Sequence, residues 1–354
     1  NRCLDRGSGV LAAIRASWDR GETPLPQPKK MIASVRKEIL SVAAACLGAP
    51  AARISLARLA GDASTRVFYR AETRGGKRRK SLVFALYPPG EGEGIVRWFR
   101  LAVSLRQAGV GVPRPYAHRP DRGYLVMQDC GDHLLQSVAR SAAPRRSLAL
   151  YLRAVDELIR MQGMRPEAYP ACPAWSLAFD LEKFLWELDF FLVHTVEGLW
   201  RARLSPAERR EFDRLFRLVA LRAIEMPFVF CHRDYHSRNL LVTRRGLRVI
   251  DFQDARLGPY AYDLASLLRD PYLHLPEEVQ RKAIAYYLRR SAAAPGSFLG
   301  KRFSADYDMV SVQRLLKAAG TYGYMARKGK RGYLRYLPAA LSRCWAILGR
   351  YSDL

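Results

Sequence analysis

Apolar positions recur along the first third of the chain in two spacings, one typical of strands and one typical of helices. Residues 31–47 and 91–108 carry apolar side chains every three or four residues, which predicts two helices. Short apolar or alternating runs predict strands at residues 53–60, 67–71, 81–87, 116–118 and 124–128. Strands and helices in one region of this size favour an α+β fold.

After residue 130 the helical spacing dominates. The predicted helices cover residues 148–161, 175–200, 206–224, 276–290, 306–325 and 333–348. Ser205 followed by Pro206 is typical of a helix start, with Ser205 as the N-cap. We therefore expect two parts, a region of strands and helices at residues 31–129 and a larger, mainly helical region at residues 130–354.

One stretch, residues 228–254, interrupts the helices and carries the candidate chemistry. An apolar run at residues 228–231 predicts a buried strand that ends at His232-Arg233-Asp234. A second apolar run, at residues 247–250, is preceded by a polar turn and is followed by Asp251. This loop and hairpin would bring the oxygen-bearing side chains of Asp234, Asn239 and Asp251 to one place.

These residue types suit phosphoryl transfer, which needs little more than in-line placement and neutralisation of phosphate charge. Asp234 can orient a substrate hydroxyl and accept its proton as the catalytic base. Asn239 and Asp251 supply hard oxygen ligands suited to Mg²⁺. Asp and Asn also cap turns and helices, so a lone His-Arg-Asp would indicate a cap or a surface loop. The fixed Asp-to-Asn spacing together with the later Asp251-Phe252 favours the functional interpretation.

The spacing H-R-D-x-x-x-x-N followed by an Asp-Phe pair is the kinase signature. Gln253 stands where protein kinases have Gly, which argues against a protein kinase. At these residues the chain resembles the aminoglycoside phosphotransferase and choline kinase superfamily, which shares the protein-kinase fold. The string H-R-D-Y-H-S-R-N-L, and a second string at residues 307–338, are similar to the bacterial N-acetylmuramate/N-acetylglucosamine anomeric kinases of cell-wall recycling.

The resemblance implies a two-lobed, protein-kinase-like α+β fold with ATP between the lobes. The small N-terminal lobe, residues 31–129, would hold an antiparallel sheet, and the larger lobe, residues 130–354, would be mainly helical. It implies a sugar kinase in which Asp234 deprotonates an anomeric hydroxyl while Asn239 and Asp251 hold Mg²⁺. Two other interpretations stay open: a kinase of another small molecule, such as an aminoglycoside, choline or a different sugar, and a catalytically silent nucleotide- or nucleic-acid-binding protein.

The nucleotide half of the site is predicted from the N-terminal lobe. Gly61, Ser64 and Thr65 lie in a turn of small residues between two predicted strands, and such a turn can cover phosphates with its backbone N–H groups. The string L-A-G-D-A-S-T-R-V-F-Y-R is similar to the phosphate-binding hairpin of the family. By the same resemblance, Gln128 and Asp129 lie at the hinge, where backbone groups meet adenine.

The predicted third strand, residues 81–87, lacks the Lys that pairs with the α- and β-phosphates in most kinases. We therefore expect Arg66, Arg70 or Arg97 to supply the missing cation. The anomeric sugar kinases that the chain resembles also tend to lack that Lys.

Three further residues are interpreted as supports rather than reacting groups. Asp263 follows a Gly-Pro turn at the start of a helix and is predicted to hydrogen-bond the backbone of the Asp234 loop. His232 and Arg233 are predicted to position that loop, and His236 is predicted to be structural.

Composition narrows the picture only slightly. The formal net charge of +26 would steer ATP and anionic sugars toward the protein, but no nucleic-acid-binding motif accompanies it. The six scattered cysteines favour a reducing, cytoplasmic setting over disulfides or zinc. No apolar run of membrane-spanning length is present. Residues 1–30 are predicted to be a flexible tail, with Met31 as a candidate start.

Overall fold

The computed structural model describes residues 33–59, 65–75, 79–291 and 296–351. These fall into two compact units, Asn1–Phe84 and Ala85–Leu354, which are described separately. The predicted flexible tail at residues 1–30 lies outside the described residues, and so do residues 60–64 of the predicted phosphate-binding turn. Among the described residues, no helix combines the length and the hydropathy needed to cross a bilayer.

The first unit joins one helix to the first strands of a sheet. Its elements are α2 (Ala33–Leu47), η1 (Ala51–Arg53), β1 (Ile54–Arg58), β2 (Val67–Thr73) and most of β3 (Ser81–Leu86). Helix α2 ends where Gly48 adopts a left-handed conformation (φ 64°), which glycine tolerates without a Cβ clash. Strands β1 and β2 pair antiparallel, with Ile54 opposite Thr73, and bury the apolar side of the pair.

The five strands of the N-terminal sheet are ordered β1-β2-β3-β5-β4. The elements that follow β3 are α3 (Gly92–Gln107), β4 (Pro115–Arg119), η2 (Pro120–Arg122) and β5 (Tyr124–Gln128). A mainly helical region comes next, so the sequence-based prediction of a kinase-like α+β fold with an N-terminal antiparallel sheet is confirmed.

The helical region begins directly after β5 and runs to the end of the described chain. Its helices are α4 (Leu135–Ser141), α5 (Pro144–Gln162), η3 (Pro173–Ser176), α6 (Leu181–Phe191), the π-helix η4 (Leu192–Glu197), α7 (Pro206–Ile224), α8 (Tyr262–Leu268), α9 (Glu277–Arg290), α10 (Phe298–Arg327), η5 (Arg331–Tyr336) and α11 (Leu337–Leu348). Helix α7 has the bounds predicted from the sequence and begins with a capping box between Ser205 and Glu208.

Two small antiparallel ribbons interrupt these helices and carry the candidate chemistry. Strand β6 (Phe228–Cys231) pairs with β9 (Arg256–Pro259), and β7 (Leu240–Thr243) pairs with β8 (Gly246–Val249). The loop between β6 and β7 holds Asp234 and Asn239, and the segment between β8 and β9 holds Asp251. The topology therefore connects each candidate residue to the end of a short, buried strand.

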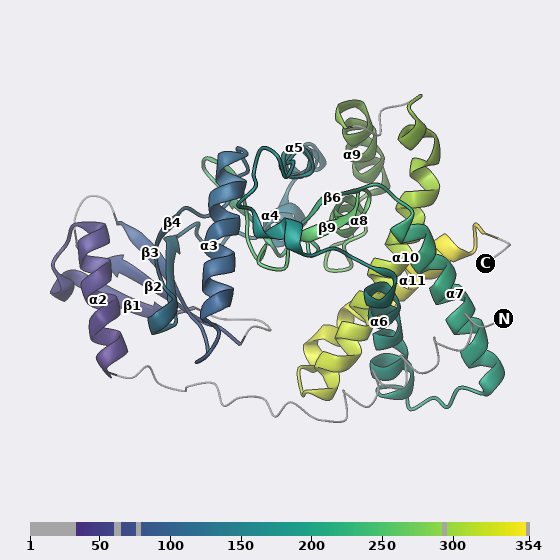
Figure 1. Ribbon diagram of the computed structural model, residues 1–354, viewed down its shortest axis with the longest axis horizontal. Helices are drawn as coiled ribbons and strands as arrows, with labels where there is room; N and C mark the ends of the chain where they lie inside the picture. The colour runs from purple at the N-terminus through teal and green to yellow at the C-terminus, as the bar shows by residue number, and fades with distance from the viewer. Residues whose placement is uncertain (1–32, 60–64, 76–78, 292–295, 352–354) are drawn as a thin grey trace. The chain divides into compact units, whose positions relative to one another are not determined.

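Helix α10 is the longest helix of the second unit, and α6, α7, α8 and α11 pack against it (Figure 1). Its buried residues include several polar and charged ones, among them Asp306, Asp308, Gln313 and Arg314. Burying a charged side chain costs free energy unless the charge is paired, so we expect the charged residues of α10 to have partners.

The predicted single helix over residues 175–200 is wrong. Leu177 and Phe179 instead exchange backbone hydrogen bonds with Leu257 of β9, which holds this segment extended. Helix α6 begins only after Asp180, whose carboxylate accepts a hydrogen bond from the Lys183 N–H and so caps the helix. The aromatic spacing of this segment concealed the break, and strand β9 was not predicted.

Candidate active site

The Asp234 loop is anchored from below by a buried carboxylate. Asp263, at the start of α8, accepts backbone N–H groups from His232 at 2.6 Å and from Arg233 at 3.0 Å. Asp263 is 1% exposed, and burial raises the pKa of its carboxyl group above the usual value. The predicted role of Asp263 as a support for this loop is confirmed.

His232 connects the Asp234 loop to the strand that precedes Asp251. Its Nδ1 accepts the backbone N–H of Asp234 at 3.3 Å, and its Nε2 lies 3.0 Å from the Ile250 carbonyl oxygen. Because Nδ1 is an acceptor here, Nε2 carries the proton and donates to Ile250. The ring therefore fixes Asp234 and the residue before Asp251 relative to each other, which confirms the predicted positioning role of His232.

Arg233 occupies a backbone conformation that is unusual for a residue with a side chain, with φ at 80°. Its guanidinium forms ion pairs with Glu187 of α6 at 3.1 Å and with Asp254 at 3.6 Å. These contacts compensate the cost of the left-handed conformation. They also turn the peptide so that the next side chain, Asp234, leaves the loop in a fixed direction, as predicted for a positioning residue.

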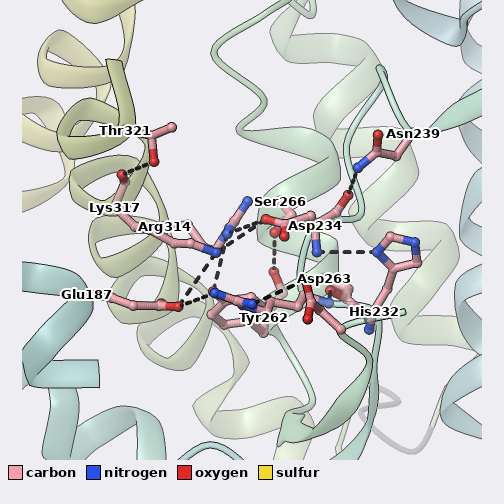
Figure 2. Close-up of polar contacts among 12 residues, drawn as sticks. Glu187, His232, Asp234, Asn239, Tyr262, Asp263, Ser266, Arg314, Lys317 and Thr321 are labelled. Atoms are coloured by element: carbon pink, nitrogen blue, oxygen red, sulfur yellow. Dashed lines mark hydrogen bonds and ion pairs between the residues drawn. The ribbon is translucent and has the colours of Figure 1, made fainter. Parts of the chain in front are cut away.

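Asn239 lies directly against the Asp234 loop. Its side-chain amide nitrogen donates to the Asp234 backbone carbonyl oxygen (Figure 2), at 2.9 Å. Its backbone carbonyl oxygen accepts the Ile250 N–H at 2.9 Å. The amide nitrogen is thereby used within the loop, and the amide oxygen is the group of this side chain that is suited to a cation. Asn239 is thus placed between Asp234 and the end of β8.

Asp251 follows β8 in a left-handed conformation with φ at 64°. Its Oδ1 accepts a hydrogen bond from Gln253 Nε2 at 2.7 Å. The next residue, Phe252, is fully buried and packs against Trp98 of α3, with ring centroids 5.1 Å apart and the rings tilted by 30°. The buried ring holds the backbone in place, so the Asp251 carboxylate projects from a fixed turn.

The oxygen atoms of Asn239 and Asp251 suit a Mg²⁺ ion that is bound together with a nucleotide better than a metal ion that is surrounded by protein ligands alone. Within the described residues, no group of three or more His, Cys, Asp and Glu side chains is placed to hold a metal ion. Mg²⁺ bound with a nucleotide needs only one or two protein ligands, because phosphates and water complete its octahedron. Asn239 and Asp251, which flank the paired strands β7 and β8, supply one amide oxygen and one carboxylate.

The carboxylate of Asp234 is held between two cations from α10. Lys317 Nζ lies 3.2 Å and Arg314 Nη1 lies 3.3 Å from its Oδ1, as Figure 2 shows. Burial alone would raise the pKa of Asp234, but Lys317, Arg314 and Arg233 outweigh it and hold that pKa well below its usual range. The Asp234 side chain remains 31% exposed, so an ionised carboxylate is open to a ligand.

Three residues of this cluster, Glu187, Arg314 and Lys317, escaped the sequence analysis. Glu187 is fully buried and accepts Gln313 Nε2 at 2.8 Å, besides its ion pairs with Arg233 and with Lys317 at 3.7 Å. A signal was present, since charged residues interrupt the apolar face of the predicted 306–325 helix. The string that contains Arg314 and Lys317 was interpreted only as a similarity to the anomeric kinases.

Arg97 is one of the three arginines predicted to replace the Lys that the third strand lacks, and its guanidinium binds the backbone near Asp251. Its guanidinium donates to three backbone carbonyls, those of Gln253 at 2.8 Å, Ala255 at 2.7 Å and Pro173 at 2.9 Å. Burial lowers the pKa of Arg97, but the group remains a cation because Arg does not deprotonate in proteins. Arg97 thus braces the Asp251 segment.

The predicted nucleotide contacts are distributed over both units. Thr65 is exposed, and the Arg66 guanidinium lies 5.8 Å from the centre of the Phe68 ring. Gly61 and Ser64 lie outside the described residues. In the second unit, the Gln128 N–H donates to the Arg114 carbonyl at 2.8 Å, and Asp129 Oδ1 accepts the Gly131 N–H at 3.0 Å. Whether these groups meet one nucleotide remains a prediction.

Comparison with known proteins agrees with the fold. A family model described as the phosphotransferase enzyme family matches residues 55–299. The crystal structure of the ADP-bound aminoglycoside phosphotransferase APH(2'')-Ib superposes with a TM-score of 0.60 at 13% identity, covering 90% of this chain and 99% of that chain. The chain belongs to the phosphotransferase enzyme family, and the predicted membership is confirmed.

Curated relatives narrow the resemblance further. The chain is 33% identical over 298 residues to the N-acetylmuramate/N-acetylglucosamine kinase of Pseudomonas aeruginosa, covering 80% of this chain and 82% of that protein. It is 28% identical over 306 residues to the enzyme of the same name from Neisseria meningitidis, covering 83% and 86%.

Proposed function

We propose that this phosphotransferase transfers the γ-phosphoryl group of ATP to the anomeric hydroxyl of an amino sugar, N-acetylmuramate or N-acetylglucosamine. The observation that carries the proposal is the cluster at Asp234, in which a partly exposed carboxylate is kept ionised between Lys317 and Arg314. The curated relatives, which bear the name N-acetylmuramate/N-acetylglucosamine kinase, support the choice of sugar.

In this proposal Asp234 orients the acceptor hydroxyl and takes its proton, since its carboxylate is ionised and accessible. Asn239 and Asp251 would hold Mg²⁺, which supplies neutralisation of phosphate charge when it is bound. His232 and Asp263 hold the Asp234 loop in place. His232 hydrogen-bonds to the Ile250 carbonyl, next to Asp251, and Asp263 accepts the backbone N–H of His232. The protein thus contributes position and electrostatics, as phosphoryl transfer requires.

The lowered pKa of Asp234 indicates which kind of acceptor hydroxyl it can deprotonate. A carboxylate whose pKa is held far below its usual range is a weak base. Proton transfer to such a base is easier from an acidic hydroxyl. An anomeric hydroxyl is more acidic than an ordinary alcohol, so this site suits a hemiacetal better than a primary or secondary alcohol.

The nucleotide contacts belong to the same proposal. Backbone N–H groups of the turn that includes Gly61, Ser64 and Thr65 would cover the phosphates, with Arg66 as the cation beside them. Backbone groups at Gln128 and Asp129 would meet the adenine ring.

The test is a substrate panel read by phosphorus NMR, which reports both transfer and the oxygen that is modified. ATP, Mg²⁺ and the protein would be incubated with N-acetylmuramate, N-acetylglucosamine, choline and an aminoglycoside. We expect an anomeric sugar phosphate that is lost when the reducing end is blocked as a methyl glycoside. Transfer to choline or to the aminoglycoside alone would reject the sugar assignment, and transfer to a non-anomeric oxygen would reject the site chemistry.

A further inference from the structure

The two cations beside Asp234 have different surroundings, although both come from one side of α10. Arg314 and Lys317 are three residues apart, and their side chains are 10% and 14% exposed. The Arg314 Nη1 that contacts Asp234 also donates to the Tyr262 hydroxyl at 3.2 Å. Arg314 is therefore fastened to a neighbouring helix as well as to the carboxylate.

Lys317 is less completely engaged. Within the described part of the chain, its ammonium makes one side-chain hydrogen bond, at 3.2 Å to Asp234. The Glu187 carboxylate lies 3.7 Å away, which is an ion pair beyond hydrogen-bonding distance. An ammonium group has three donors, so Lys317 keeps capacity for another acceptor that enters beside Asp234.

The two carboxylates next to Lys317 are each shared with a second cation. Asp234 also pairs with Arg314, and Glu187 also pairs with Arg233. A carboxylate shared between two cations does not fully neutralise either of them, so an anion that enters beside Lys317 is attracted to it.

The position of that anion follows from Asp234. A hydroxyl bound to this carboxylate places its oxygen about 2.7 Å from it, and the same oxygen forms the new bond to phosphorus. Lys317 Nζ is 3.2 Å from the same carboxylate oxygen. The transferring phosphoryl group therefore passes within reach of the ammonium.

We propose that Lys317 is a further catalytic residue, whose ammonium group binds an oxygen of the transferring phosphoryl group while Glu187 keeps it in place (Figure 2). The inference rests on the proposed phosphoryl transfer at Asp234. The bond from the acceptor oxygen to phosphorus forms, and the bond from phosphorus to the β–γ bridging oxygen breaks. The electron pair of that bond leaves with ADP, the hydroxyl proton goes to Asp234, and Lys317 retains its protons.

This arrangement makes Lys317 responsive to the reaction itself. As Asp234 gains the proton it ceases to be an anion, so its ion pair with Lys317 is lost. In the same step the negative charge of the transferring phosphoryl group is spread over its three equatorial oxygens. The ammonium exchanges one anionic partner for another without leaving the cluster, and a preorganised donor of this kind stabilises the transition state.

The experiment compares Lys317→Met, Lys317→Arg and, as a matched control, Lys301→Met at an exposed position of the same helix. Loss of one preorganised donor typically lowers kcat by about 10²–10³-fold. We expect that loss in Lys317→Met with the ATP KM within about threefold, partial activity in Lys317→Arg, and an unchanged kcat in Lys301→Met.

Adenosine 5'-(γ-thio)triphosphate separates a phosphoryl contact from a structural role. Sulfur on the γ-phosphoryl group weakens a contact with an ammonium, so the ratio of the rates with ATP and with the thio analogue should fall in Lys317→Met. An equal loss with both nucleotides, or a kcat within twofold of wild type, overturns the proposal. If Lys317→Met does not fold, the same ratio in Lys317→Arg decides, because a change of cation alters only a direct contact.

The acceptor in these assays is the compound that the wild-type protein phosphorylates in the panel. If none of the sugars is phosphorylated, hydrolysis of ATP with water as the acceptor provides both rates. Failure of the sugar assignment and failure of the Lys317 inference are therefore separate outcomes.

Discussion

The segments that carry Asp234 and Asp251 share one backbone device but differ in how they are held. Each contains a residue with a side chain at positive φ, Arg233 at 80° and Asp251 at 64°. The Asp234 loop is held by enclosed charges, including Glu187 and Asp263. The Asp251 segment is held by the buried Phe252 ring and by Arg97, whose donors go to neutral backbone carbonyls.

The difference in charge matches the difference in proposed role. Cations lie within 3.3 Å of the Asp234 carboxylate, so it stays ionised but cannot be a strong metal ligand. The positive charge of Arg97 is directed at backbone carbonyls, and the Asp251 carboxylate accepts a hydrogen bond from the Gln253 amide. In the proposed function Asp251 is a ligand of Mg²⁺, and Asp234 receives the acceptor hydroxyl.

The largest expected effects come from replacing each carboxylate by its amide. Asp234→Asn and Asp251→Asn should each lower kcat by about 10²–10⁴-fold, since one removes a general base and the other removes metal-borne neutralisation of phosphate charge. Only Asp251→Asn should raise the Mg²⁺ concentration needed for half-maximal rate. Steady-state kinetics over a Mg²⁺ titration measures both.

Asp121→Asn is a matched control for these two variants, since Asp121 is exposed and pairs with Arg119 on the surface. It should leave kcat and the Mg²⁺ requirement unchanged. A rise in the Mg²⁺ requirement of Asp234→Asn equal to that of Asp251→Asn would contradict the division of roles between the two carboxylates.

A smaller effect is expected from Arg97, which we consider a positioning residue of the Asp251 segment. Arg97→Lys cannot reproduce a planar group that donates to three carbonyls. Small misplacement of a reacting group can be costly, and we expect kcat to fall about tenfold with an increased Mg²⁺ requirement. Arg100→Lys, exposed on the same helix, is the control. A normal Mg²⁺ requirement in Arg97→Lys would show that its bonds do not position Asp251.

The same contrast explains what the sequence could and could not predict. Asp234, Asn239 and Asp251 were found because their spacing along the chain is short and fixed, with strands of recognisable apolar pattern between them. Glu187, Arg314 and Lys317 lie 47 or more positions from Asp234 in the sequence and reach it only through the packing of α6 and α10. The spacing of apolar residues along the chain does not indicate which distant residues come into contact. Likewise, the break before α6 depends on pairing with β9, a non-local contact that the helical spacing outweighed.

The smallest expected effect is a pH dependence that reports on Lys317. Burial lowers the pKa of Lys317 to about 8, although Asp234 and Glu187 raise it in part. The ammonium is charged below this pKa and neutral above it, so kcat/KM for ATP, which reports the free enzyme, should fall severalfold as the pH rises through about 8. Asp234 stays ionised on the acid side because its pKa is held far below the usual range, so it adds no acid limb between pH 5 and 7. Lys317→Arg keeps its charge at these pH values and should lose the alkaline limb, whereas persistence of the limb in that variant would assign the titration to another group.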